Sequence, residues 1–189
     1  MAGNALADQK RHDLAPLGNA APSKSRSRTT PAPDMVLDGG VANISRSRTI
    51  TAQPQAIWAV LADFGALSSW SENVDHSCIM NHGPGGDAVG TTRRVQIGRN
   101  VLVERITEVD PVTSLAYCVE GLPRRLHTVV NRWTLRPADV GTVVTLTSSV
   151  DIGANPVARA AEWAVCRGLA RESESMLAGL ARRTENGYV

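Results

Sequence analysis

ITAQPQAIWAVLADFGALSSW, residues 50–70, contains the end of one strand, a helix start and a helix break within a single short segment. Pro54 suits the first turn of a helix, where its missing N–H leaves no hydrogen bond unmade. Gly65 ends the helical pattern, and ALSSW then forms a second short helical piece. We therefore predict a strand over residues 44–52 followed by two short helices. The packing face of the first helix contains Ile57, Trp58, Val60, Leu61 and Phe64.

Beyond this segment, the sequence predicts six strands in hairpin succession and one long terminal helix. Short connections imply an antiparallel sheet, and a lone long helix must bury its apolar stripe against that sheet. The predicted fold class is therefore α+β. The strands are expected near residues 74–81, 89–97, 101–110, 114–121, 125–137 and 141–152, and the helix from Asn155-Pro156 nearly to the C-terminus.

The apolar stripe of the terminal helix is interrupted by small residues. Small residues that face a curved sheet leave room between helix and sheet, and that room is where we expect a ligand. The stripe consists of Val157, Ala161, Val165, Leu169, Met176 and Leu180, and the small residues are Ala160, Ala164 and Gly168.

The first 40 residues differ in composition from the rest of the chain. Residues 15–34, APLGNAAPSKSRSRTTPAPD, are rich in Pro, Ser, Ala and Arg and show no periodicity. Such a segment buries too little apolar area to offset its ordering entropy. We therefore predict a disordered tail over residues 1–40 and a single ligand-binding domain over residues 41–189.

Charge and hydropathy exclude several classes of protein. The 20 Lys and Arg residues nearly balance 18 Asp and Glu residues, and both Lys residues lie in the predicted tail. A balanced domain argues against a nucleic-acid footprint, which normally needs a clustered basic face. The sequence has no apolar leader and no stretch of transmembrane length, so we expect no stable membrane insertion and a cytoplasmic location.

The chain carries no recognisable catalytic or metal-binding signature. Its three cysteines have neither CxxC nor Cys/His ligand spacing. His76 and His82 flank a Gly/Pro-rich loop, but their spacing fits no familiar metal site. The GxSxG elbow and the P-loop pattern are also missing. We therefore expect no metal and no cofactor, and the sequence assigns no catalytic residue.

Four segments together resemble a known superfamily. ITAQPQAIWAVLADFGALSSW, VGTTRRVQIGRNVLVERITEVDP, LAYCVEGLP and NRWTL follow the order and spacing of the START-related SRPBCC superfamily. This is the polyketide cyclase/dehydrase and lipid-transport group that also includes the birch-pollen-allergen fold. The resemblance implies a helix-grip fold, in which a curved antiparallel sheet wraps a long C-terminal helix and leaves a ligand cavity. It implies no substrate, because the superfamily includes carriers, receptors, cyclases and hydrolytic enzymes.

Side-chain alternation predicts the wall of that cavity. If Arg99-Asn100 is a two-residue turn, Arg93, Val95 and Ile97 share one face with Leu102, Glu104 and Ile106. Four of these six residues are apolar, which marks the face as inward, and Arg93 lies diagonally from Glu104. The pair is then the anchor for a polar ligand group. Alternatively, the two charges only neutralise each other, or a three-residue turn moves Glu104 to the outer face.

The same alternation assigns inner faces to the later strands. These faces are largely apolar with a few polar groups, as in a small-molecule pocket, although each polar group could equally be a satisfied core residue. The candidates are Tyr117, His127, Asn131, Trp133 and Ser148. In the first segment, Trp58 and Phe64 are predicted to be core, whereas Trp70 is placed near the cavity mouth. Trp70→Ala should then weaken ligand binding more than it destabilises the fold.

Three functions remain open at this point. The first is non-catalytic binding or transport of a hydrophobic or amphipathic small molecule, such as a lipid, a polyketide or an aromatic metabolite. The second is a cyclase or dehydratase that uses Arg93, Glu104, His127 and Asn131. The third is an interaction module whose basic tail recruits a partner. The sequence leaves the oligomeric state open.

Overall fold

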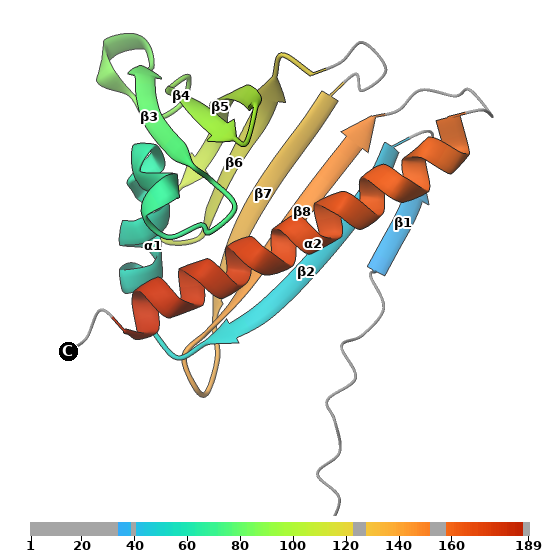
Figure 1. The fold of residues 1–189 in the computed structure, drawn as a ribbon. Helices are drawn as coiled ribbons and strands as arrows, with labels where there is room; N and C mark the ends of the chain where they lie inside the picture. Colours follow the sequence, from blue (N-terminus) through green and yellow to red (C-terminus); the bar gives the residue numbers. More distant parts are fainter. Residues whose placement is uncertain (1–33, 39–40, 123–127, 152–157, 187–189) are drawn as a thin grey trace, which may run out of the picture. The chain divides into compact units, whose positions relative to one another are not determined.

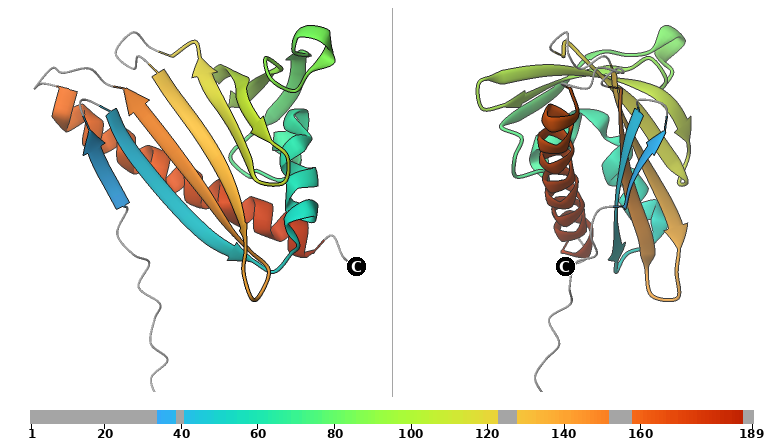
Figure 2. Two further views of the ribbon diagram at one scale, coloured as in Figure 1. Left: turned by 180° about the vertical axis from the view of Figure 1, so that it is seen from behind. Right: turned by 90° about the vertical axis from the view of Figure 1, so that its right-hand side faces the viewer.

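A single curved antiparallel sheet carries a long helix along one face (Figure 1). The computed structural model describes residues 34–38, 41–122, 128–151 and 158–186, which belong to one compact unit. For residues 34–38 and 158–166, it describes the backbone without the side chains. Figure 2 shows from two further sides that α2 (Ala158–Glu185) lies along the inner face of the curved sheet. This arrangement is the predicted helix-grip fold.

Within the described residues the sheet has eight strands, in the order β1-β2-β8-β7-β6-β5-β4-β3. Three short helical segments accompany it: α1 (Pro54–Ala62), η1 (Phe64–Ser69) and η2 (Pro84–Gly86). The strands are β1 (Asp34–Asp38), β2 (Val41–Ile50), β3 (His76–Asn81), β4 (Thr92–Ile97), β5 (Asn100–Asp110), β6 (Ser114–Glu120), β7 (Thr128–Pro137) and β8 (Thr142–Asp151).

Strand β1 was not expected, because it lies inside the predicted tail. Its five residues pair antiparallel with β2, with Met35 opposite Ile44. The prediction for residues 34–38 was therefore wrong. The signal was weak because a strand of this length is stabilised by pairing with a neighbour and has too few residues to show its own periodicity. Residues 1–33 of the predicted tail lie outside the described residues.

The first helices form where the segment 50–70 predicts them, with one correction. Helix α1 starts at Pro54 as expected, but it ends at Ala62, and the chain turns at Asp63 before η1 begins. Gly65 lies inside η1 and is not the helix break. A Cβ atom at Gly65 would lie 2.9 Å from Cγ1 of Ile79, so this glycine lets β3 pack closely against η1.

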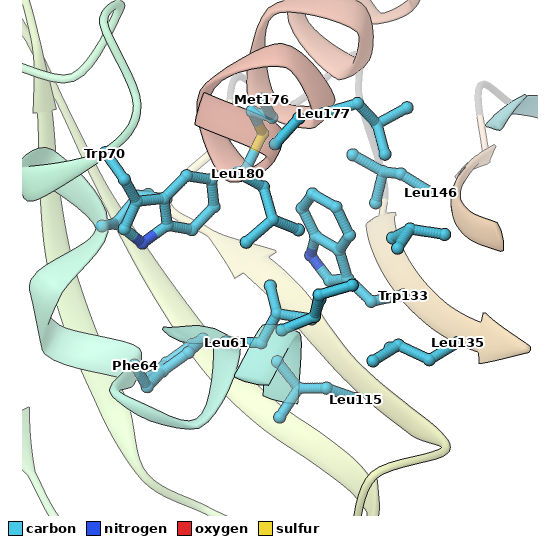
Figure 3. Packing of buried hydrophobic residues seen from close by; sticks show 14 of the residues in the cluster. Leu61, Phe64, Trp70, Leu115, Trp133, Leu135, Leu146, Met176, Leu177 and Leu180 are labelled. Carbon is cyan, nitrogen blue, oxygen red and sulfur yellow. The ribbon is translucent and has the colours of Figure 1, made fainter. Parts of the chain in front are cut away.

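The main hydrophobic core lies between α1, η1, the inner face of the sheet and the second half of α2. Phe64 is buried there as predicted, whereas Trp58 is half-buried and packs at the edge of the core. The indole of Trp70 packs edge-on against that of Trp133, with ring centroids 6.3 Å apart. Figure 3 shows these two rings beneath α2, beside Leu180.

The predicted apolar stripe of α2 is confirmed where its side chains are described. Met176 and Leu180 are buried and Leu169 is half-buried, and Leu177 and Ala181 join them in the core. The side chains of Val157, Ala160, Ala161, Ala164 and Val165 lie outside the described residues. Gly168 is exposed and so does not contribute the room that we expected. The close approach instead occurs at Gly179, where a Cβ atom would collide with the carbonyl oxygen of Trp70.

In the described part of the chain, no helix is both long and apolar enough to cross a membrane.

Candidate ligand-binding cavity

A cavity of about 160 Å³ lies between the inner face of β4 to β7 and helix α2. Its wall is mostly apolar, and its polar groups are Glu104, Tyr117, Asn131 and Glu172. The described apolar residues that line it are Leu67, Val74, Val95, Ile97, Leu102, Val119, Leu122, Val129, Leu169 and Met176. An apolar wall with a few polar groups is the usual character of a small-molecule site.

The β4–β5 hairpin determines which residues reach this cavity. Ile97 pairs with Asn100, so the turn consists of Gly98 and Arg99, not of Arg99 and Asn100 as predicted. Gly98 has a positive φ of 59°, which a type II′ hairpin turn requires of its first central residue. The register therefore differs from the predicted one by two residues. Because side chains alternate with a period of two, the predicted inner face is unchanged.

This register places Arg93 directly opposite Glu104, rather than diagonally. Arg93 Nε donates a hydrogen bond to Glu104 Oε2 over 2.6 Å, and the side chains are only 4% and 9% exposed. Both charges lie inside, so the alternative register with Glu104 on the outer face is excluded. A buried charge of this kind is tolerated only when it is paired and hydrogen-bonded.

The guanidinium of Arg93 is enclosed by the protein on several sides. Nη1 donates to the carbonyl oxygen of Phe64 over 2.8 Å. Cζ lies 3.9 Å from the ring centroid of Phe64 and 5.0 Å from that of Tyr117, both within cation–π range. Arg93 is not among the described residues that line the cavity. It therefore holds Glu104 and the two rings in place and does not itself form the wall.

Tyr117 is the buried hydroxyl of the site. Its burial raises the pKa of the phenol above the ordinary value, and the nearby carboxylate of Glu104 raises the pKa further. The guanidinium of Arg93 and hydrogen bonds from Trp133 and Asn131 act in the opposite direction and lower the pKa. Burial dominates, so the hydroxyl keeps its proton at neutral pH.

A ladder of polar side chains crosses three strands on the inner face. Asn131 lies opposite Tyr117 on β6 and opposite Ser148 on β8. Ser148 Oγ donates to Asn131 Oδ1 over 2.6 Å, and this bond fixes the amide of Asn131 opposite Tyr117 on the neighbouring strand. The buried Ser148 therefore holds Asn131 in place, and Asn131 lines the cavity together with Tyr117.

Six of the eight predicted site residues fall into two groups. Glu104, Tyr117 and Asn131 line the cavity, whereas Arg93, Trp133 and Ser148 lie behind them as supporting residues. Trp70, which was predicted at the cavity mouth, belongs to neither group because it does not line this cavity. It is 8% exposed and packs in the core, because α2 closes over it at Gly179. His127 lies outside the described residues.

Sequence reasoning missed Glu172 and the apolar residues Leu67, Val74 and Leu122. Glu172 lies on α2 between Leu169 and Met176, at spacings of three and four that place all three on one helix face. That spacing was a usable signal, but an acidic residue in an apolar stripe does not stand out by periodicity. Over the described ranges, no cluster of three or more His, Cys, Asp and Glu residues is arranged to hold a metal ion.

A curved antiparallel sheet, a long helix along its inner face and a cavity between them define the helix-grip proteins of the START/SRPBCC superfamily. The chain belongs to the polyketide cyclase/dehydrase and lipid transport family, whose model matches residues 41–185. A comparison with curated proteins finds no match.

Solved structures share the fold at low sequence identity. The di-domain ARO/CYC StfQ from the steffimycin biosynthetic pathway has a TM-score of 0.66 at 14% identity, over 78% of this chain and 51% of StfQ. The Zhui aromatase/cyclase from Streptomyces sp. R1128 has a TM-score of 0.58 at 18% identity, over 76% and 95% of the two chains. A START superfamily protein from Mycobacterium smegmatis has a TM-score of 0.61 at 14% identity, over 76% and 97%.

The chain thus spans about half the length of StfQ and nearly the full length of the other two proteins. Family and fold fit both hydrophobic-ligand binding and polyketide cyclase or aromatase roles.

Proposed function

We propose that this protein binds a hydrophobic or amphipathic small molecule in the cavity between its sheet and α2. The observation that carries the proposal is an apolar cavity into which Glu104, Tyr117 and Asn131 project from neighbouring strands. The apolar wall supplies most of the binding free energy, and the polar groups orient the ligand.

The size of the cavity limits the ligand. A dry apolar cavity of about 150 Å³ accommodates benzene, and the cavity here has a volume of about 160 Å³. It therefore suits a molecule with one aromatic ring or a short branched chain. A lipid or a polyketide of several rings needs a wider space than this volume.

The test is to fill the cavity and measure binding of toluene. Val129 lines the cavity and is 4% exposed, so Val129→Phe places a ring in the space that the ligand uses. Val130 is the next residue on β7 and its side chain points to the other face, so Val130→Phe is the matched control. We expect wild type and Val130→Phe to bind toluene in ligand-observed NMR, and Val129→Phe to lose the signal.

Two results would contradict the proposal: no toluene binding by the wild type, or equal binding by Val129→Phe and wild type. Native mass spectrometry of the purified full-length chain adds an independent readout. A natural ligand that copurifies should be retained by Val130→Phe and lost from Val129→Phe.

A cyclase or dehydratase activity is the second candidate. It is favoured by one observation, that a carboxylate (Glu104) and a protonated phenol (Tyr117) line the same cavity and so supply a proton acceptor and a proton donor. The proposed test is dehydration of 4-hydroxy-4-phenyl-2-butanone, followed by the absorbance of the enone product. Turnover that Glu104→Gln abolishes would favour the enzyme; a rate equal to the uncatalysed one would exclude this reaction.

A further inference from the structure

The charged groups that reach the cavity from the described part of the chain are both acidic. Among the described lining residues, Glu104 and Glu172 carry carboxylates and none carries a basic side chain. Glu172 comes from α2, and its Oε2 accepts a hydrogen bond from Asn73 Nδ2 over 3.1 Å. A carboxylate brought into this cavity therefore meets the like charges of the buried Glu104 and the half-buried Glu172.

Arg93, the cation paired with Glu104, does not line the cavity. Its Nε is bound to Glu104, its Nη1 is bound to the Phe64 carbonyl, and its Cζ lies over the rings of Phe64 and Tyr117. A ligand carboxylate that took the place of Glu104 on this guanidinium would leave the buried charge of Glu104 without its partner.

Glu104 nevertheless keeps a free acceptor. Its hydrogen bond with Arg93 uses Oε2, and no group in the described part of the chain donates to Oε1. Because Glu104 lines the cavity, Oε1 is the oxygen that a ligand can reach. A carboxylate oxygen without a hydrogen bond favours a ligand that brings a donor.

Tyr117 supplies the complementary donor. No described group accepts a hydrogen bond from the Tyr117 hydroxyl, and burial raises the pKa of the phenol, so its O–H proton stays in place and remains to be donated. Tyr117 and Glu104 are diagonal neighbours on the inner face, because Tyr117 pairs with Ile106 and Glu104 pairs with Val119. Diagonal neighbours of this kind lie about 7–8 Å apart at their backbones, within reach of one ligand group.

We propose that the cavity selects an uncharged ligand that bears a hydroxyl group, of about the size of one aromatic ring, and rejects carboxylates. The ligand hydroxyl donates to Glu104 Oε1 and accepts from the Tyr117 O–H. This inference rests on the proposed binding function and adds the chemical class of the ligand. It also separates the site from one that would hold a free fatty acid by its headgroup.

The test compares toluene, phenol and benzoate, which have similar rings and differ in hydrogen bonding and charge. Dissociation constants are measured by ligand-observed NMR titration of the full-length chain at neutral pH. We expect phenol to bind more tightly than toluene, and at least about tenfold more tightly than benzoate, because a like charge in an interior site is costly.

Each outcome has a defined meaning. If none of the three compounds binds, the proposed binding function itself fails. If toluene binds as tightly as phenol, or benzoate binds as tightly as either, the cavity binds ligands but the inference on ligand class is overturned.

Two glutamates on β5 provide a matched pair of variants. Glu104 and Glu108 are each paired with an arginine, but Glu104 faces the cavity whereas Glu108 is exposed beside Arg132. Glu104→Gln should raise the affinity for benzoate and reduce the preference for phenol, and Glu108→Gln should change neither. If both variants change the affinities for benzoate and phenol equally, the proposed role of Glu104 in ligand selection is contradicted.

Two further variants keep the inference testable if Glu104→Gln does not fold. Glu172→Gln removes the second carboxylate from the wall and should also raise the affinity for benzoate. Tyr117→Phe removes the donor and should weaken phenol binding while leaving toluene binding unchanged. An unchanged ratio of phenol to benzoate affinity in Glu172→Gln, together with unchanged phenol binding in Tyr117→Phe, would overturn the inference.

Discussion

Arg93 and Glu104 face each other directly across β4 and β5, with Nε and Oε2 2.6 Å apart and both side chains buried. The pair connects the sheet to η1, because Arg93 also donates to the carbonyl oxygen of Phe64. Its removal should therefore affect the fold, whereas the ligand proposed above would use the oxygen of Glu104 that Arg93 leaves free.

The first prediction concerns the stability of this pair. Glu104→Leu leaves the buried guanidinium without its partner and should lower the free energy of unfolding by about 3–5 kcal/mol. The double variant Arg93→Met/Glu104→Leu should recover a large part of this loss, because neither charge is then buried alone. Urea denaturation of the single and double variants measures both values. Additive losses in the double variant would show that the two charges do not depend on each other.

The second prediction concerns Trp70, now placed in the core. Trp70→Ala should lower the free energy of unfolding by about 3–5 kcal/mol, because it opens a large void beside Trp133. Trp70→Phe should lower the free energy of unfolding by less. It keeps much of the packing and removes an indole N–H that has no partner within the described structure. In the folded Phe variant, toluene affinity should equal that of the wild type. A loss of toluene binding there would return Trp70 to the ligand site.

The third prediction compares two glycines of α2. A Cβ atom at Gly179 would collide with the Trp70 carbonyl oxygen, whereas at Gly168 nothing lies within 4 Å. Gly179→Ala should therefore destabilise the fold by about 1–3 kcal/mol through overpacking. Gly168→Ala should stabilise it by about 0.5–1 kcal/mol, because alanine loses less backbone entropy in a helix. Thermal and urea unfolding report both changes. If Gly179→Ala and Gly168→Ala change the free energy of unfolding in the same direction, the close approach at Gly179 is contradicted.

The fourth prediction concerns alkaline pH. Burial raises the pKa of Tyr117 above its ordinary value of 10.0, so the folded state holds this proton more tightly than the unfolded state does. The resulting stabilisation is fully present below pH 10.0 and is lost as the pH rises above it. Tyr117 should contribute a decline of up to about 1.4 kcal/mol per pH unit in the free energy of unfolding.

The control for this effect is Tyr117→Phe. Its free energy of unfolding should decline less steeply with pH, because the variant lacks the phenol group. Urea unfolding at pH values on either side of 10.0 gives the two slopes. In the folded wild type, the phenolate absorbance of Tyr117 should not develop until the chain unfolds. If the free energy of unfolding falls with pH in parallel for wild type and Tyr117→Phe, the hydroxyl of Tyr117 is not buried as described.

The β4–β5 hairpin shows how local pattern can be right while register is wrong. The pattern could not distinguish a turn at Gly98-Arg99 from one at Arg99-Asn100, and the structure has the former. The inner face was still predicted correctly, because an error of two residues preserves the alternation of side chains. The direct opposition of Arg93 and Glu104, and hence their ion pair, depends on the register itself.

Strand β1 shows the limit of local patterns. Residues 34–38 have too few positions for a periodic signal, and they become a strand by pairing with β2. This pairing depends on β2 as much as on residues 34–38, so the sequence of residues 34–38 alone does not reveal it.

The sequence by itself determined the order of the strands from β2 onward, their antiparallel connections and their inward faces, because these follow from turn residues and from alternation along each strand. The tertiary structure decided which inward residues form the cavity and which form the core. Helix α2 covers Trp70 and Trp133 and leaves space above Glu104, Tyr117 and Asn131. That division depends on where a distant helix crosses the sheet, and its close contact at Gly179 exists only after folding.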